Sequence, residues 1–430
     1  MEKVLIISYF FPPCNLTASQ RAQSWANYLS KFGYKPVVIT RRWDHKISHL
    51  SDVSKATPDA ILHQENENYE VYYVPYHPNL RDQIYVKYRE NGFNFLRRFL
   101  TMMELLFQPF FNAAIPYDNI GEFANDYLEK NPDVKKMVVS GNPFNLFKFG
   151  YQLHNSTGIK WIADYRDAWT TGQIQLIDKG FFHRFIHSLD AHYEKKWVGT
   201  ARVVTASSQP IADEIGKLVK RKSHAIYNGF VLEDFKGIKV EGKFTDFTIT
   251  YVGMLYPGQK VEIFLDAYKE FIRQTPDVKA KLLFPGIAFL ADQHARIKNA
   301  MTGFEPYYEC TERIERMAIL EIEKRSHLLF HVAWDEHKGI IASKIYEYIA
   351  SGSYIIVTPT DHGAIEEIVQ KSGCGVCTET VEETVAFLKS EYENYLAGRI
   401  KVNDTSSANV LQFSREKQAG VLAELLNQLK

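Results

Sequence analysis

The stretch SKIYEYIASGSYIIVT, residues 343–358, predicts a helix of about two turns that ends at Gly352 and leads into a buried strand. The helix has one apolar face that can pack on a sheet, formed by Ile345, Tyr348 and Ile349. Lys344 stands in its first turn, where the positive end of the helix dipole disfavours a cation. An anion bound beside Lys344 would remove this cost, so the stretch indicates both an α/β layer and a candidate anion site.

The same alternation of helices and strands extends along most of the chain and predicts a doubly wound α/β fold. In the first half, apolar runs typical of buried parallel strands occupy residues 3–8, 35–40, 69–75, 136–141, 160–165 and 201–207. In the second half, strands are expected over residues 248–253, 281–286, 327–334 and 354–358. Helices are expected between them, over residues 260–273, 289–300, 311–325 and 343–351, and a last helix over about 412–429.

A polar stretch that is poor in strand signals, residues 228–247, separates the two halves, and we interpret it as the interdomain connection. A chain of 430 residues is long enough for two domains. We expect a first Rossmann-like domain over residues 1–232 and a second over residues 245–411, with the C-terminal helix, 412–430, packing back on the first. Ligands of such sheets bind at the carboxyl ends of the strands, so a cleft between the domains is the expected ligand site.

Composition excludes several classes of protein. The 51 basic residues balance the 51 acidic ones, so no global field attracts the chain to nucleic acid. The apolar run near the N-terminus is short and is interrupted by Pro12 and Pro13, unlike a signal peptide, and a cytoplasmic location is expected. Cys374 and Cys377 form a lone CxxC, which supplies half of a zinc site at most, so no metal site is expected.

Three loops at predicted strand ends could surround one diphosphate. Lys344 and Glu347 share one helical face, so Lys344 and the free backbone N–H groups could hold a phosphate while Glu347 accepts hydrogen bonds from ribose or sugar hydroxyls. Gly253 permits close approach to the backbone, Lys260 supplies a second cation, and Gly363 begins another helix. A solvated ion pair between Lys344 and Glu347 is the alternative interpretation.

Five blocks of sequence, in this order, resemble the landmarks of bacterial GT-B glycosyltransferases of the family 4 type. They are SYFFPPCNLTASQR (8–21), GIKWIADYRDAW (158–169), YNGF (227–230), ITYVGMLYPGQK (249–260) and SKIYEYIASGSYIIVTPTDHGAIEEIV (343–369). The resemblance covers about residues 3–385. It implies retaining transfer of a sugar from a nucleotide diphosphate donor, with the donor held mainly by the C-terminal domain and the acceptor by the N-terminal one.

The resemblance also implies roles for single residues. By position, Glu347 resembles the second glutamate of the family's Glu-x7-Glu motif, which binds the donor ribose, and Lys260 resembles the lysine on the donor diphosphate. The chain departs from the pattern at Gly339, in place of the first glutamate, and at Met254, where many members have an arginine. Lys344 could replace that missing cation. No Asp-x-Asp motif is present, so we expect no metal or other cofactor, and a UDP- or GDP-linked sugar as substrate.

Charged residues of the first domain are candidates for the reaction itself. Arg21 could reach the donor phosphate or an anionic acceptor from the first turn of its helix. Asp164, Arg166 and Asp167 place three charges at the end of an apolar strand, where many relatives of the family have a histidine followed by an aspartate. We expect these three at the catalytic site, with a buried structural cluster as the alternative. Because no nucleophile stands out, attack by the acceptor hydroxyl on the face that the phosphate leaves is favoured.

Two aromatic segments bear on the acceptor. Residues 93–115 combine dense aromatics with Arg97 and Arg98, and residues 179–187 are similar. Such pieces can lie on a membrane surface, or they can be core helices. The membrane interpretation predicts peripheral contact with the inner face of the membrane and a polyprenyl-linked glycan acceptor, as in the assembly of surface polysaccharides.

Other functions share this architecture. A UDP-sugar epimerase needs acid and base groups around the sugar ring, and the Asp164–Asp167 cluster could supply them. A non-catalytic GT-B subunit that only binds would explain the missing first glutamate, although Lys260, Lys344 and Glu347 are retained. A sugar phosphorylase finds no support in the sequence.

Overall fold

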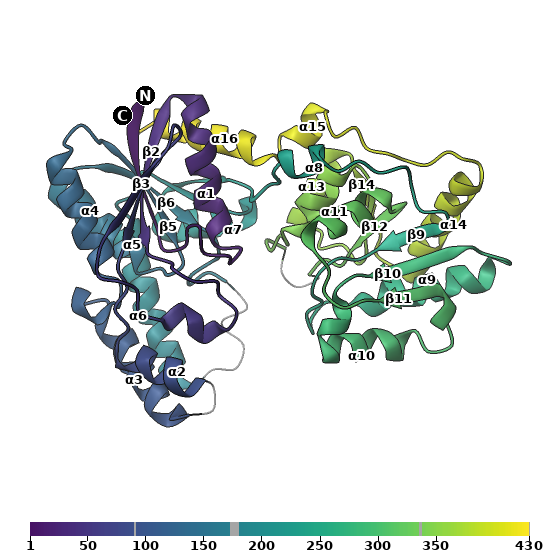
Figure 1. Ribbon diagram of the computed structural model, residues 1–430, viewed down its shortest axis with the longest axis horizontal. Coiled ribbons are helices and arrows are strands. Elements are labelled where there is room, and N and C mark those ends of the chain that lie inside the picture. The colour runs from purple at the N-terminus through teal and green to yellow at the C-terminus, as the bar shows by residue number, and fades with distance from the viewer. Residues whose placement is uncertain (90–91, 173–179, 335–337, 430) are drawn as a thin grey trace. The chain divides into compact units, whose positions relative to one another are not determined.

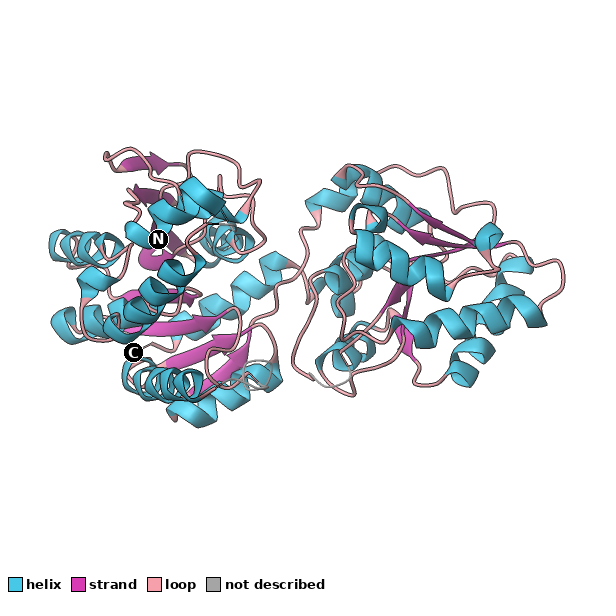
Figure 2. Ribbon diagram, turned by 90° about the horizontal axis from the view of Figure 1, so that it is seen from below, coloured by secondary structure: helices cyan, strands magenta, loops and turns pink. Residues whose placement is uncertain are grey.

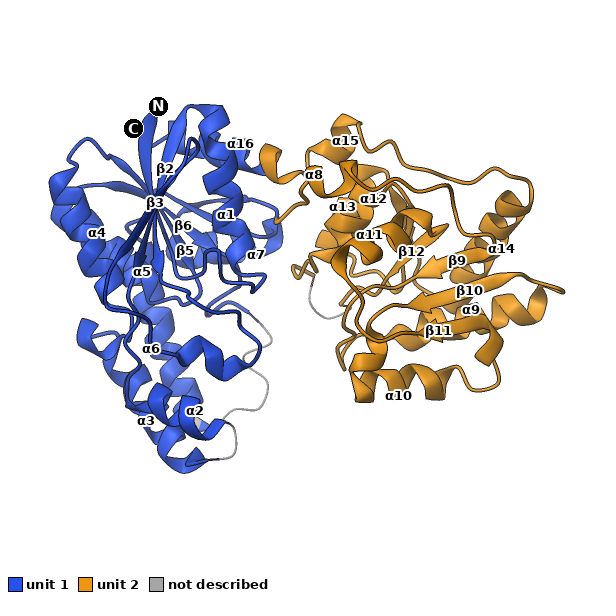
Figure 3. Ribbon diagram, in the orientation of Figure 1, with its two compact units in different colours: residues 1–227, 418–430 blue, residues 228–417 orange. Residues whose placement is uncertain are grey.

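The computed structural model describes residues 1–89, 92–172, 180–334 and 338–429. The chain divides into two compact units, which are shown in different colours in Figure 3. Unit 1 comprises residues 1–227 and 418–430, and unit 2 comprises residues 228–417. Each unit contains one sheet, with helices on both of its faces (Figure 2).

The sheet of unit 1 has eight strands in the order β3-β4-β2-β1-β5-β6-β7-β8 (Figure 1). The strands are β1 (Glu2–Ser8), β2 (Tyr34–Arg41), β3 (Leu62–Glu65), β4 (Glu70–Val74), β5 (Lys136–Gly141), β6 (Lys160–Tyr165), β7 (Val203–Ala206) and β8 (Lys222–Ala225). All neighbouring pairs are parallel except β3 and β4. The chain builds outward from β1 to one side and then returns to the other, which is the doubly wound arrangement.

Unit 1 has helices on both faces of this sheet and two further helices, which contact each other away from the sheet (Figure 1). They are α1 (Ser19–Tyr28), α2 (Leu80–Tyr88), α3 (Asn94–Phe107), α4 (Asn119–Lys130), α5 (Leu146–Thr157), α6 (Phe181–Val198), α7 (Gln209–Val219) and most of α16 (Arg415–Asn427). Leu5 and Ile7 of β1 belong to the core that packs on α4 and α5, whereas Val4 and Ile6 belong to the core that packs on α1 and α16. From Val4 to Ile7 both faces of β1 are buried, so this part of the strand is a continuous apolar run.

The sheet of unit 2 has six parallel strands in the order β11-β10-β9-β12-β13-β14. The strands are β9 (Phe247–Thr250), β10 (Ala280–Phe284), β11 (Tyr308–Cys310), β12 (Leu328–His331), β13 (Tyr354–Val357) and β14 (Gly375–Cys377). The helices are α8 (Glu233–Lys236), α9 (Val261–Gln274), α10 (Ala291–Ala300), α11 (Arg316–Arg325), α12 (Lys344–Ser351), α13 (Ala364–Ser372), α14 (Val381–Leu396) and α15 (Ala408–Leu411). The strand order reverses between β9 and β12, so the loops after these strands lie where open α/β sheets bind ligands.

Three predicted boundaries are wrong in unit 2. The helix predicted over 311–325 begins at Arg316, because Thr311 still hydrogen-bonds to the end of β10: its N–H donates to the Phe284 carbonyl, 3.3 Å away, and its hydroxyl accepts from the Gly286 N–H at 3.2 Å. The strands predicted over 248–253 and 327–334 end at Thr250 and His331. Because β9 and β12 end early, the loops that follow these two central strands shape the site.

Candidate functional site

Lys344 and Gly253, two residues that the sequence singled out, meet at the carboxyl end of β9. Gly253 has a φ of +89°, and a Cβ atom there would lie 3.4 Å from Lys344 Nζ. The amine donates to the Met254 carbonyl at 3.3 Å and lies 3.9 Å from the centre of the Tyr251 ring. A Cβ atom at that distance would make an ordinary van der Waals contact, so the positive φ, and not a clash with Lys344, favours glycine here. The Lys344 amine itself lies against the loop after β9.

The surroundings of Lys344 disfavour the protonated form of its amine. Part of the side chain stays exposed, but protein atoms crowd the amine, and this burial lowers the pKa of Lys344 to about 7. The acidic groups of Glu323 and Glu347 oppose the change. At neutral pH the amine is close to half protonated. A bound phosphate would favour the protonated form, because its negative charge stabilises the ammonium group.

Two buried ionisable groups lie near this amine. Glu323 of α11 is fully buried, and burial raises its pKa well above the usual range, which favours the neutral carboxyl. Neither of its oxygens has a hydrogen-bond partner among the residues that the structure describes. His331 ends β12, and burial, with the Lys344 charge as a smaller cause, lowers its pKa to about 3, so the imidazole is neutral too. Neither of these two groups is therefore an ionised counter-ion for Lys344.

The start of α12 offers backbone donors beside the amine. Within the described part of the chain, the N–H groups of Ser343 and Lys344 form no hydrogen bond, and Ser343 does not cap the helix with its side chain. The same helix is fixed to the loop after β9 by Tyr348, whose hydroxyl accepts from the Val252 N–H at 2.8 Å. Backbone N–H groups and a cation at a helix N-terminus are the usual ligands of a phosphate.

Glu347 is held by a residue that the sequence analysis missed. Arg316 Nη1 donates to Glu347 Oε1 at 2.8 Å, and Arg316 Nη2 donates to Asp234 Oδ2 at 3.0 Å. The alternative interpretation, an ion pair between Lys344 and Glu347, is not found among the described residues, because Arg316 pairs with Glu347 instead. Nothing local in the sequence signals this contact, since 31 positions separate Arg316 from Glu347.

Lys260 lies in the same loop after β9, directly before α9, and its side chain is exposed. The loop is fixed by its neighbour Gln259, which is 2% exposed and donates to the Val332 carbonyl at 2.7 Å. The loops after β9 and β12, the two strands at the reversal of the sheet order, are thereby joined. The predicted contact between Lys260 and a diphosphate stays a prediction.

Gly363 precedes α13, but the backbone donors at this helix start are already in use. The buried carboxylate of Asp361 accepts from the N–H groups of Gly363, Ile365 and Glu366 at 3.0 to 3.1 Å. The Ala364 N–H donates to the Lys338 carbonyl at 2.8 Å. A phosphate could use these donors only in place of those acceptors. Close packing explains the glycine at position 363 instead, because a Cβ atom there would lie 2.5 Å from the Lys338 carbonyl oxygen.

In unit 1, Arg21 and Asp164 bind each other. Arg21 Nη2 donates to Asp164 Oδ1 at 2.6 Å, and Arg21 Nη1 donates to the Ile226 carbonyl at 2.6 Å. Asp164 is fully buried and also accepts from Ser140 at 2.9 Å and from Thr205 at 2.7 Å. The pair therefore joins α1 to strands β5, β6 and β7, and both groups are used by the fold itself.

Arg166 and Asp167 lie outside that buried pair. Asp167 is exposed, and its Oδ2 accepts from Arg166 Nη2 at 3.1 Å and from Asn142 Nδ2 at 3.3 Å. The guanidinium of Arg166 lies 5.7 Å from the Phe10 ring centre. The three charges predicted to form one cluster are thus divided between the interior and the surface at the carboxyl end of β6.

The described residues also bear on two larger features, membrane-spanning helices and metal sites. In the part of the chain that the structure describes, no helix is long and apolar enough to cross a membrane. Cys374 is buried and Cys377 is half-buried, and both are free thiols beside and on β14. No group of three His, Cys, Asp or Glu side chains within the same described ranges is arranged to hold a metal ion.

Comparison with known structures confirms the fold class. Sucrose-phosphate synthase from Thermosynechococcus elongatus is 13% identical, with a TM-score of 0.59 over 100% of this chain and 99% of that one. HepE from Anabaena, in complex with UDP and glucose, is 11% identical, with a TM-score of 0.56 over 100% of both chains. A putative UDP-N-acetylglucosamine 2-epimerase from Listeria monocytogenes is 11% identical, with a TM-score of 0.51 over 99% of this chain and 96% of that one.

Neither a scan of protein-family models nor a search of curated proteins gives a match. The structural matches define the class: the chain has an α/β fold with two Rossmann-like domains, as in GT-B glycosyltransferases.

Proposed function

We propose that this chain is a glycosyltransferase that moves a sugar from a nucleotide diphosphate donor to a glycan or lipid-linked glycan. The observation that carries the proposal is the Lys344 amine, which lies against Gly253 at α12, the helix whose first N–H groups form no hydrogen bond with any residue that the structure describes. These groups form a diphosphate site at the strand-order reversal of unit 2. The names of the structural neighbours support a UDP-linked donor, because HepE was solved with UDP and glucose.

The proposed chemistry is electrostatic. Cleavage of the bond between sugar and diphosphate builds negative charge on the leaving phosphate, and fixed cations beside that phosphate stabilise the transition state. We assign this role to Lys344 and Lys260, with the ribose on Glu347. The acceptor hydroxyl attacks from the face that the phosphate leaves and gives its proton to that phosphate, which retains the configuration of the sugar.

Calorimetric titration of the purified chain with UDP and GDP tests the donor site. We expect one nucleotide to bind, and Lys344→Ala to weaken it by a factor of ten or more, since a phosphate contact to a charged amine contributes about 1.5 kcal/mol or more. Lys298→Ala is the matched control, because Lys298 is an exposed lysine on α10 of the same unit. Equal binding by wild type and Lys344→Ala would refute the assignment.

Helix α3 supports a membrane-bound acceptor. It has no buried residue, and its aromatic side chains are open to solvent, with Phe95 87% exposed and Phe99 44% exposed. Arg98 on the same helix is exposed as well. We propose that this face rests on the inner surface of the membrane and brings unit 1 to a polyprenyl-linked glycan. Of the second aromatic segment, residue 179 lies outside the described residues.

An epimerase is the second candidate, because the Listeria structure with that name shares the fold. Incubation of the enzyme with a nucleotide sugar and no acceptor separates the two functions. A transferase leaves the sugar configuration unchanged, whereas an epimerase converts the sugar, which chromatography or NMR of the nucleotide sugar detects.

A further inference from the structure

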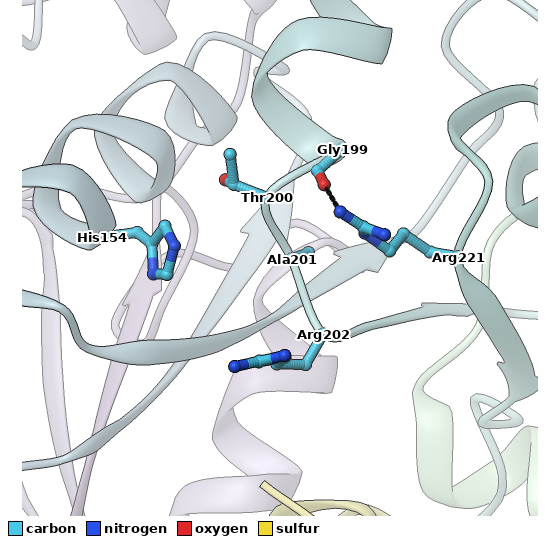
Figure 4. Close-up of a pocket in the computed structure, with 6 residues that line it drawn as sticks. All are labelled: His154, Gly199, Thr200, Ala201, Arg202 and Arg221. Carbon is cyan, nitrogen blue, oxygen red and sulfur yellow. Dashed lines mark hydrogen bonds between the residues drawn. The ribbon is translucent and has the colours of Figure 1, made fainter. Parts of the chain in front are cut away.

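Unit 1 contains a cavity of about 340 Å³ that none of the candidate residues above lines. It is lined by His154, Gly199, Thr200, Ala201, Arg202 and Arg221 (Figure 4). His154 lies in the last turn of α5, which leads to β6, and the others lie in the segments that connect α6 to β7 and α7 to β8. The cavity therefore lies at the amino ends of β6, β7 and β8, whereas Arg166 and Asp167 lie at the carboxyl end of β6.

The cavity presents two guanidinium groups and no carboxylate. Arg221 is anchored by a hydrogen bond from Nη2 to the Gly199 carbonyl, which Figure 4 shows as a dashed line. Arg202 is exposed, and its guanidinium makes no hydrogen bond or ion pair with any residue that the structure describes. Two arginines on one cavity are typical of phosphate recognition, because each guanidinium offers a planar fork of donors.

His154 and Thr200 complete the polar lining. His154 Nδ1 lies 2.7 Å from the Ile159 carbonyl and donates to it, which leaves Nε2 available to a ligand hydroxyl. The Thr200 hydroxyl is already used, since it donates to the Trp197 carbonyl at 2.8 Å and accepts from Trp161 at 3.2 Å. Thr200 thus fixes the segment between α6 and β7, from which Arg202 extends.

Neither Arg202 nor Arg221 forms an ion pair with a carboxylate that the structure describes. Elsewhere on this edge of the sheet, lysines near strand starts have carboxylate partners: Lys3 with Glu70 at 3.1 Å and Lys136 with Glu2 at 3.0 Å. Near the cavity, the remaining basic side chains form no ion pair within the described ranges; these are Lys160, Lys220 and Lys222. Repulsion among these cations and the two arginines favours binding of an anion there.

We propose that this cavity is a second binding site, which takes the phosphate group of a small phosphorylated molecule or of a lipid headgroup. Its volume is at the lower end of the range of small-molecule sites, about 300 to 1,000 Å³, so it suits a phosphate monoester. The site is independent of the proposed donor site, because every residue that lines it belongs to unit 1.

Titration of the whole protein with inorganic phosphate and with glucose 6-phosphate, at constant ionic strength, tests the proposal. We expect binding that Arg202→Glu abolishes and that Arg202→Gln weakens about tenfold, since loss of one charge-assisted contact costs about 1.4 kcal/mol or more. Lys46→Glu is the control, because Lys46 is exposed and follows the carboxyl end of β2, on the opposite edge of the sheet. An unchanged melting temperature of each variant without ligand shows that it folds.

Flotation with vesicles of phosphatidylglycerol, against vesicles of phosphatidylcholine, separates the two sources of phosphate. Binding of soluble phosphate that depends on Arg202 identifies a metabolite site, and flotation alone that depends on Arg202 identifies a lipid headgroup. The proposal is overturned if neither probe binds, or if Arg202→Glu binds both probes as well as Lys46→Glu does.

Discussion

Lys344 begins α12 with an amine that is only partly protonated near neutral pH, because burial lowers its pKa to about 7. A diphosphate favours the charged amine. Below the pKa the lysine is already charged and binding takes up no proton, whereas above it each binding event must also protonate Lys344. The affinity for a nucleotide sugar should therefore be highest below about pH 7 and fall by up to about tenfold per pH unit above it.

Calorimetry from about pH 6 to about pH 8.5 measures this dependence. A nucleotide diphosphate sugar is the better probe, since both of its phosphates stay ionised over that range. Lys344→Met should bind weakly at every pH and lose the slope, and Lys298→Met should keep it. A flat profile for the wild type would contradict the role of Lys344.

In the proposed donor site, Arg316 and the donor ribose would compete for Glu347. The Arg316 side chain is 55% exposed, and an exposed ion pair contributes only about 0.2 to 1 kcal/mol. Two ribose hydroxyls need both Glu347 oxygens, one of which Arg316 holds. Arg316→Ala should therefore tighten nucleotide binding about two- to fivefold. The control is Arg325→Ala, which removes an exposed pair with Glu321 from the same helix. Weaker binding by Arg316→Ala would show that the arginine holds Glu347 in place for the ligand.

Asp164 and Asp167 were predicted for the same role, but the structure gives them opposite surroundings. Asp164→Ala would leave the buried Arg21 guanidinium without its carboxylate, and the cost of such a change is about 3 to 5 kcal/mol. Asp167→Ala, at an exposed position, should change the free energy of unfolding by less than about 0.5 kcal/mol. Urea unfolding followed by tryptophan fluorescence reports on unit 1, which holds five of the six tryptophans. Similar stabilities of the two variants would contradict the structural role of Asp164.

Contacts between residues that are far apart in the sequence were the part of the site that could not be predicted. Glycine and lysine at strand and helix ends indicated Gly253 and Lys344, because these positions follow from local pattern alone. The partner of Asp164 lies 143 positions away, and the partner of Glu347 lies 31 positions away. Both Arg21 and Glu347 looked free for a ligand, since a local pattern does not show which charges meet after folding.

Among the elements, the central strands were predictable and the edge strands were not. The strands β1, β2, β5 and β6 are buried on both faces along most of their length, so each contains a run of consecutive apolar residues. The missed strands lie at or next to sheet edges and are short and partly polar; they are β3, β8, β11 and β14. An edge strand needs little apolar sequence because one side of it has no neighbouring strand.

Helix α3 is the element whose sequence had two interpretations, a core helix or a membrane-surface helix. The absence of buried residues on it excludes the core interpretation. Flotation with anionic vesicles should recover the wild type, and the double variant Phe95→Ser, Phe99→Ser should remain in solution, because each exposed aromatic side chain contributes apolar area to membrane binding. Phe289→Ser is the control for an exposed phenylalanine of unit 2. Equal flotation of the two variants would exclude α3 as the contact.

The whole chain has a formal net charge of zero, but its basic and acidic residues are distributed unevenly over unit 1. Composition therefore excluded a general attraction to anions but gave no sign of the local excess around Arg202 and Arg221. That excess arises because lysines and arginines near the starts of β6, β7 and β8 are brought together by the sheet, while the acids of the same edge lie by β1 and β4. Only the folded arrangement shows which charges compensate each other.

The two proposed phosphate sites belong to different units, so one experiment on the intact chain can separate them. Hydrogen exchange with the bound nucleotide sugar should slow in residues 251–263 and 339–347, the loops after β9 and β12, because ligand contacts there must break before the amides exchange. Inorganic phosphate should instead slow exchange in residues 199–202 and 220–224. If the nucleotide sugar protected only the second pair of segments, the donor site would lie in the basic cavity of unit 1, and the assignment of Lys344 would be wrong.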